Sequence, residues 1–135
     1  MFQDSPSAAG DPTATARKGV PTAAIETAAL LFRAAGDSER LRLLSVLAGI
    51  GADVDASDEF SVTELAARTD ANLPAVSQRL RVLREAGLVD RRRDGKRICY
   101  RLCDDHVAAL VRAAVAHSVE EHTHQHRAST DEHGR

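Results

Sequence analysis

The chain has 135 residues, 43% of them hydrophobic but only 3% aromatic, with no tryptophan and a formal net charge of −2. This length suits one domain, and the shortage of aromatic residues predicts a core of leucine, valine and alanine, as in small helical proteins. No apolar run approaches the roughly 20 residues that a membrane span requires, and no secretory signal is visible, so we expect a cytoplasmic protein with reduced cysteines and no membrane partner.

The first part of the chain predicts an arm, two helices and a loop. Residues 1–20 are rich in Ser, Ala, Pro, Thr and Gly without a helical period, which is typical of a disordered arm. Apolar residues recur at helical spacing from Thr22 to Ala35, and a second helix should follow as far as Ala48. The predicted buried side of that second helix consists of Leu41, Leu44, Ser45, Val46 and Leu47. Residues 52–60 predict an acidic loop.

The next two predicted helices are joined by a short turn. Ser61-Val-Thr-Glu64 fits a capping box before a short helix over residues 63–68. Asn72 is suited to cap the following helix, whose apolar stripe is Val76, Leu80 and Leu83. The residues left on the outer face of this helix are Ser77, Gln78, Arg81 and Arg84. A short turn followed by a helix with a polar, basic outer face is typical of a helix-turn-helix unit.

A basic hairpin is predicted directly after this unit. Asp94-Gly95 indicates a two-residue turn, and the alternation of apolar and polar residues beyond it places Cys99 on the outward face. Between Leu73 and Cys103 nine basic residues stand against three acidic ones, so this stretch carries +6 and the rest of the chain −8. Such a basic surface indicates binding to DNA. The expected base-reading residues are Ser77, Gln78 and Arg81, with Arg84 beside them, and the expected phosphate contacts are Arg91, Arg92, Arg93, Lys96 and Arg97.

A last helix, opening near Asp104, carries four residues of types that bind metals: Asp104, His106, His117 and Glu120. The two histidines are eleven residues apart, so both leave the helix from one face. The same eleven residues rise roughly 16 Å, which bonds of about 2 Å to zinc cannot span. One helix therefore cannot complete a metal site alone.

A second copy running antiparallel would complete the site. It brings His117 and Glu120 of one chain beside Asp104 and His106 of the other, which gives two histidines and two carboxylates at each end of the pair. Between the histidines lies a seam of small and apolar residues that favours close helix packing: Ala109, Leu110, Ala113 and Ala114. The alternative is a helix whose histidines and carboxylates are simply solvated.

Beyond this helix we expect a His-rich flexible tail over residues 122–135. Its histidines His122, His124 and His126 would either extend the metal shell to six ligands, which suits nickel or cobalt better than zinc, or form a loose polar tract. Cys103, next to the metal motif, is interpreted as a small buried residue rather than a ligand or a redox switch.

The order of these motifs resembles the ArsR/SmtB family of metal-responsive winged-helix repressors. The resemblance covers residues 21–121 and is carried by Ser61-Val-Thr-Glu-Leu-Ala66, Ala75-Val-Ser-Gln-Arg-Leu-Arg-Val-Leu-Arg84, Ala86-Gly-Leu-Val89, Asp94-Gly95, and Asp104-x-His106 with His117-x-x-Glu120. It implies a mainly α fold with a small β-hairpin, a winged helix-turn-helix, dimerising through the first and last helices. The chain departs from the family at Leu73, where a glutamine is common, and it has no cysteine over residues 63–68, where some members place a thiolate pair.

The resemblance implies a homodimeric repressor that binds an imperfect inverted repeat of double-stranded operator DNA and releases it on binding zinc, or alternatively cobalt or nickel. Two other functions compete with it. One is a winged-helix DNA-binding regulator without a metal response. The other is a metalloenzyme, which we do not expect, because His117-Ser-Val-Glu-Glu-His122 is one residue too long for the H-x-x-E-H motif.

Overall fold

The computed structural model describes residues 19–51 and 59–133, with side chains as far as Thr123. The arm predicted over residues 1–20 therefore lies almost wholly outside the described residues, as does most of the acidic loop predicted over residues 52–60.

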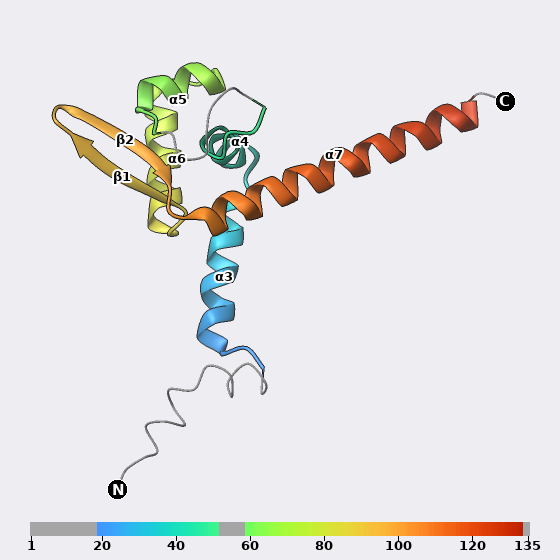
Figure 1. Ribbon diagram of the computed structural model, residues 1–135, viewed down its shortest axis with the longest axis horizontal. Helices are drawn as coiled ribbons and strands as arrows, with labels where there is room; N and C mark the ends of the chain where they lie inside the picture. Colours follow the sequence, from blue (N-terminus) through green and yellow to red (C-terminus); the bar gives the residue numbers. More distant parts are fainter. Residues whose placement is uncertain (1–18, 52–58, 134–135) are drawn as a thin grey trace, which may run out of the picture.

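A compact body and two projecting helices make up the described chain (Figure 1). The elements follow in the order α3 (Thr22–Ala35), α4 (Ser38–Leu47), α5 (Val62–Thr69), α6 (Leu73–Glu85), β1 (Val89–Asp94), β2 (Arg97–Leu102) and α7 (Asp105–His133). The body holds α4, α5, α6 and the hairpin, whereas α3 and most of α7 point away from it. This arrangement confirms the predicted mainly α fold with a helix-turn-helix unit and a hairpin wing.

Side-chain caps determine where the helices of the body begin. The Asp37 carboxylate accepts the Arg40 N–H at 3.0 Å ahead of α4, and the Asn72 side chain accepts the Ala75 N–H at 2.9 Å ahead of α6. Ser61 and Glu64 form the full capping box of α5. Each cap satisfies a backbone N–H donor that has no partner within its own helix. Polar residues just ahead of a segment with helical spacing therefore mark where these helices begin.

The core is centred on α4, which contacts α3, α5, α6, α7 and β2. Leu44 and Leu47 are fully buried as predicted, but so is Leu43, which the sequence interpretation left out. Leu41, Ser45 and Val46, predicted to be buried, are only half-buried. The prediction assumed one buried face, whereas a helix surrounded on several sides buries residues that a single amphipathic stripe does not include.

The hairpin is antiparallel, with Val89 opposite Leu102 and Asp94 opposite Arg97. Its two-residue loop is therefore Gly95-Lys96, one residue later than the Asp94-Gly95 turn that the sequence predicted, and the φ of 65° at Gly95 is the positive value that a first loop residue needs in such a turn. Phe60 forms an additional bridge to Tyr100, so a third short segment lies along the outer edge of β2.

Cys99 lies at 5% exposure, so the prediction that it faces outward is wrong. Alternation along a strand assigns side chains to faces but does not say which faces are covered. Here the Phe60 segment covers the edge of β2, and an ion pair between Arg92 and Glu59 lies on the same face as Cys99.

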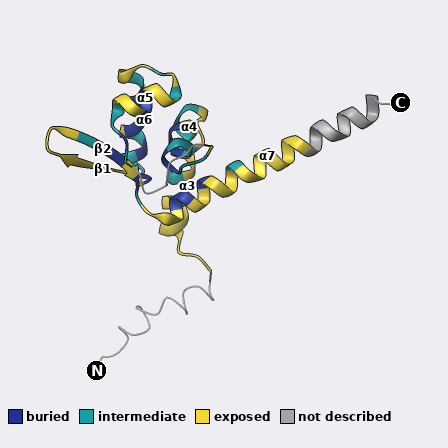
Figure 2. Cartoon of the chain, turned by 45° about the horizontal axis from the view of Figure 1, so that its top comes forward, coloured by how far each residue is buried: buried dark blue, intermediate teal, exposed yellow. Residues whose placement is uncertain are grey.

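Only the beginning of α7 belongs to the core. Val107, Ala108 and Val111 are buried, whereas the side chains from Ala116 to Thr123 are exposed (Figure 2). The helical backbone continues to His133, through the stretch for which the sequence predicted a flexible tail, because no glycine or proline interrupts it before Gly134. The exposed part of α7 is thus a long surface without a partner in one chain. Among the described residues, no helix is both long and apolar enough to cross a lipid bilayer.

Candidate nucleic-acid interface and metal site

The outer face of α6 presents the predicted base-reading residues. Val76, Leu80 and Leu83 are fully buried against the body, as their spacing predicted. This packing leaves Ser77, Gln78 and Arg81 exposed, the first two on the second turn of the helix. Polar side chains near the start of a recognition helix are the ones that reach base edges in the major groove. Arg81 forms an exposed ion pair with Glu85 at 3.3 Å, a contact weak enough to be exchanged for another acceptor.

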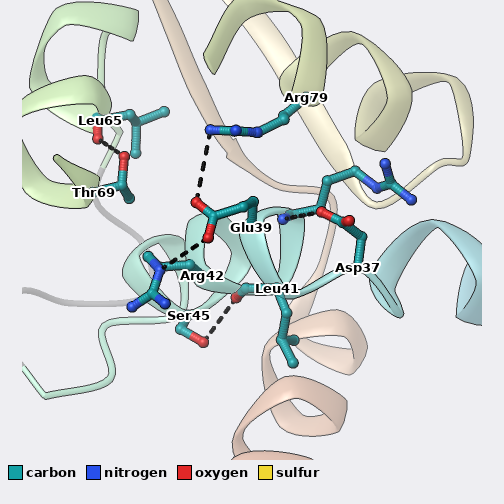
Figure 3. A network of polar contacts seen from close by, with 9 residues as sticks. Asp37, Glu39, Leu41, Arg42, Ser45, Leu65, Thr69 and Arg79 are labelled. Atoms are coloured by element: carbon teal, nitrogen blue, oxygen red, sulfur yellow. Dashed lines mark hydrogen bonds and ion pairs between the residues drawn. The ribbon is translucent and has the colours of Figure 1, made fainter. Parts of the chain in front are cut away.

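Two other arginines of α6, Arg79 and Arg84, are less exposed than the predicted base-reading residues. Arg84, predicted as part of the DNA surface, is half-buried. Arg79 is turned toward α4, where its Nη1 lies 3.9 Å from a carboxylate oxygen of Glu39 (Figure 3). Glu39 also lies 3.9 Å from Arg42 on its own helix. Arg79 therefore lies toward α4 rather than adding to the outer face of the recognition helix.

The predicted phosphate contacts all lie on the wing and are exposed. The register divides them between two faces. Arg91 lies opposite Tyr100 and Arg93 opposite Ile98, whereas Arg92 lies opposite Cys99 on the other face. Lys96 occupies the loop at the tip. The wing is thus basic on both faces, whereas the prediction from the sequence did not separate its arginines by face.

Two of these arginines are paired with carboxylates from outside the hairpin. Arg92 Nε donates to Glu59 Oε1 at 3.0 Å, and Arg97 pairs with Glu64 of the α5 capping box. The sequence predicted the cap at Glu64 but neither ion pair. Each pair joins residues 33 positions apart, and no local pattern in a sequence indicates a contact of that separation.

The four predicted metal ligands all lie exposed at the start and along one side of α7. Asp104 Oδ1 accepts the Val107 N–H at 3.0 Å, so this residue caps the helix. His106 Nδ1 lies 3.9 Å from the same oxygen. His117 and Glu120 follow three turns later, so the four residues form two separate pairs in one chain.

Among the described side chains, no cluster of three or more His, Cys, Asp or Glu could hold a metal ion. The composition of each proposed site, with one half from each of two chains, stays a prediction. Imidazole and carboxylate are donors that zinc accepts, and all four side chains are accessible to a second chain. Of the tail histidines, His122 is exposed beside an apolar groove lined by Leu41, Val115 and Val119, while His124 and His126 lie outside the described side chains.

Apolar side chains are exposed on the two projecting helices. Ile25, Leu30 and Phe32 of α3 are each more than half exposed, as is Val119 of α7. Leu110, in the predicted seam between the two histidines, is 37% exposed. Large apolar residues that cluster on two unpartnered helices mark a protein–protein interface more often than a free surface.

Cys103, which the sequence predicted to be buried, is half-buried, in the environment of an unreactive thiol. Its Sγ donates to Asp90 Oδ1 at 3.3 Å, and burial together with this carboxylate raises the pKa of Cys103 to about 11. The thiolate form is therefore scarce at neutral pH, and thiolate is the form that binds metals and reacts with oxidants. Cys99 and Cys103 are both free thiols.

The backbone N–H of Cys103 donates to the carbonyl of Leu88 at 3.0 Å, which connects the start of α7 to the segment that follows α6.

Known proteins resemble this chain in sequence and in structure. A family model described as a helix-turn-helix domain matches residues 35–92. A biofilm growth-associated repressor from Agrobacterium fabrum is 44% identical over 88 residues, which are 65% of this chain and 68% of that protein. A transcriptional repressor SmtB homolog from Synechocystis is 41% identical over 86 residues, 64% of this chain and 59% of the relative.

Among solved structures, the homodimeric winged helix-turn-helix DNA-binding domain of Mb0332 from Mycobacterium bovis, described as a possible ArsR-family transcriptional regulator, superposes with a TM-score of 0.63. It is 31% identical, and the match covers 79% of this chain and 94% of that one.

Proposed function

Because this chain belongs to the ArsR/SmtB family of winged helix-turn-helix transcriptional regulators, we propose that it is a metal-responsive repressor. Its metal-free homodimer binds operator DNA, and it releases that DNA when zinc binds between the two α7 helices. The observation that carries the metal response is the arrangement of α7. Asp104 and His106 lie at one end of an exposed helix face and His117 and Glu120 three turns away, so only a second antiparallel copy completes either site.

The unpartnered apolar residues of α3 and α7 support the dimer. A dimer of this kind presents two α6 helices, each flanked by a wing. Recognition helices that read successive major grooves on one side of DNA lie about 34 Å apart, so the operator should be an imperfect inverted repeat. Ser77, Gln78 and Arg81 would read bases, and basic residues of the wing that have no carboxylate partner, among them Arg91, Arg93 and Lys96, would contact phosphates.

Metal binding would alter DNA affinity only if it favours one arrangement of the dimer. The ligands come from both chains, so closing them around zinc fixes the crossing of the two α7 helices. A zinc-binding histidine usually donates its second ring N–H to a neighbouring acceptor. The family resemblance suggests this role for His117, with a backbone carbonyl at the end of α6, near Ala86 or Gly87, as the acceptor. The start of α7 is further tied to Leu88 through the Cys103 N–H.

Titrating operator binding with metals tests the function directly. The metal-free chain should bind a fluorescent inverted-repeat duplex, and saturating zinc should lower its affinity 5- to 150-fold, which is the usual range of such coupling. Fluorescence anisotropy with zinc, cobalt and nickel in turn measures this effect. Binding that no metal changes would favour the second candidate, a winged-helix regulator without a metal response.

The choice among metals depends on the coordination number. Two histidines and two carboxylates form a tetrahedral shell that suits zinc, whereas an added tail histidine would favour nickel or cobalt. His122 is exposed, but it lies two residues from Glu120 and so leaves α7 from nearly the opposite side, beside the groove lined by Leu41 and Val119, which does not favour this alternative. A nickel response lost on removing residues 122–135 would support the nickel or cobalt sensor.

Dimerisation is tested independently of metal. Sedimentation of the metal-free chain at micromolar concentration should give a species of twice the 14.5 kDa chain mass, because α3 and α7 already expose the apolar surface of the interface. A monomer under these conditions would remove the second half of each proposed metal site.

A further inference from the structure

Two of the six basic wing residues are held by carboxylates of the same chain. Arg92 Nε donates to both oxygens of Glu59, at 3.0 and 3.3 Å, and the guanidinium of Arg97 pairs with Glu64 Oε1. Glu59 lies just ahead of α5 and Glu64 in its first turn. Each ion pair therefore connects the wing to the first helix of the helix-turn-helix unit.

Glu59 is held in place by the backbone beside it. The Phe60 N–H donates to the Tyr100 carbonyl at 3.0 Å, and the Tyr100 N–H donates to the Phe60 carbonyl at 2.7 Å. The Glu59 side chain is 22% exposed, so its carboxylate is partly shielded from solvent. Because Arg92 lies opposite Cys99 in the hairpin, the ion pair spans β2 on the face that carries Cys99.

Glu64 is held by its own helix start. Its Oε1 accepts the Ser61 N–H at 2.8 Å, while the Ser61 hydroxyl accepts the Glu64 N–H at 3.2 Å. The hydrogen bond from the Ser61 backbone, helped by Arg97, lowers the pKa of Glu64, so the carboxylate stays ionised at neutral pH. Hydrogen bonds to Glu59 and to Glu64 raise the pKa of Arg92 and of Arg97, respectively.

The geometry points to Glu59 and Glu64 as positioning residues that orient the wing on α5 and keep Arg92 and Arg97 off the DNA backbone. This inference rests on the proposed DNA-binding function. An exposed pair of mobile side chains is weak and exchanges readily. Here the Glu64 carboxylate accepts a backbone hydrogen bond from Ser61, and Glu59 directly precedes Phe60, whose backbone is paired with Tyr100 of β2, so each arginine has a preformed partner within the chain. Of the four remaining basic wing residues, Arg91, Arg93 and Lys96 then provide the phosphate contacts.

The consequence is a limit on sequence-independent affinity. Phosphate contacts fix a protein on the duplex without reading its sequence, and each one adds to non-specific binding. Withholding two cations from phosphate lowers binding to random DNA, while the base contacts of α6 are unaffected. Glu59 and Glu64 thereby increase the share of the affinity that depends on sequence.

The salt dependence of binding to a random duplex tests the inference. The slope of log K against log salt falls by about 0.9 for each phosphate neutralised. Glu59→Gln and Glu64→Gln should each bind random DNA more tightly and steepen the slope by about 0.9, because each frees one arginine. Glutamine at position 64 still serves in a capping box, so the start of α5 is preserved. Glu26→Gln on the exposed surface of α3 removes the same charge and should leave the slope unchanged.

A double variant separates release of the arginine from the loss of charge. Glu59→Gln combined with Arg92→Gln should return the slope to the wild-type value. An unchanged slope in both single variants would mean that the arginines already contact phosphate, and a flatter slope with weaker binding would mean that the carboxylates only support the fold. Either result overturns the inference. A wild-type chain that binds neither operator nor random duplex would overturn the proposed function as well. The measurement on the wild-type chain therefore distinguishes failure of the proposed function from failure of this inference.

Discussion

Replacing His117 with asparagine should abolish the zinc-dependent release of operator DNA while leaving metal-free binding intact. The wild-type chain should lose 5- to 150-fold in operator affinity when zinc is added, and the variant should lose almost none. The reason is that His117 would both bind zinc and donate its second ring N–H toward the end of α6. Asparagine retains a polar group but provides no imidazole for either bond. Operator anisotropy with and without zinc measures the effect.

A variant at Asp104 provides the matched control. Because Asp104 caps α7 through the Val107 N–H, alanine would weaken the helix start as well as the metal site. Asparagine caps a helix about as well as aspartate but lacks the charge, so Asp104→Asn isolates the contribution to metal binding. At zinc concentrations that saturate it, Asp104→Asn should still release DNA. If a His117 variant that binds zinc also releases DNA normally, the carbonyl relay is wrong and the crossing of the α7 helices alone carries the signal.

Replacing Arg81 with alanine should weaken operator binding by about 1–3 kcal/mol, roughly 5- to 150-fold, and weaken binding to random DNA far less. Arg81 is exposed on the outer face of α6, and its ion pair with Glu85 is solvent-exposed, so the guanidinium is available to a base edge. A bidentate contact of arginine with guanine is the commonest specific contact in the major groove. Competition anisotropy with operator and random duplexes measures both affinities.

Lys96→Ala is the comparison for Arg81→Ala. Lys96 lies in the loop at the wing tip, where a phosphate contact would be independent of sequence. Its removal should weaken both duplexes alike and flatten the salt slope by about one. Equal losses on the two duplexes for Arg81→Ala would remove Arg81 from the base-reading residues and place it with Lys96.

Most helices and the hairpin could be predicted from patterns within short stretches of the sequence. Ser61 and Asn72 cap their helices where the sequence predicted, and the buried stripe of Val76, Leu80 and Leu83 follows from helical spacing alone. Such features depend on residues within one or two turns of each other, so a short window of sequence contains all of the information. For the same reason the hairpin could be predicted from Asp94-Gly95 and the alternation beyond it.

The sequence predicted which residues belong to the candidate sites, but it predicted only part of what surrounds them. The exposure of Ser77, Gln78 and Arg81 follows from the same helical spacing that buries Leu80. The roles of the metal residues on α7 stay predictions, because each site needs a second chain. The surroundings of Arg79, turned to Glu39, and of Cys103, bonded to Asp90, depend on neighbouring elements that composition and periodicity do not identify.

The sequence alone determined that this protein is a small helical domain with a helix-turn-helix, a basic wing and a last helix carrying two pairs of candidate metal ligands. Only the tertiary structure decided which wing arginines are paired, that Cys99 is buried and that α4 is enclosed on several sides. Spacing along the chain sets which side chains share a face, since helix and strand geometry repeat locally. Segments far away in sequence determine what covers that face. Glu59 and Glu64 contact Arg92 and Arg97 in this way, and no local repeat encodes such contacts.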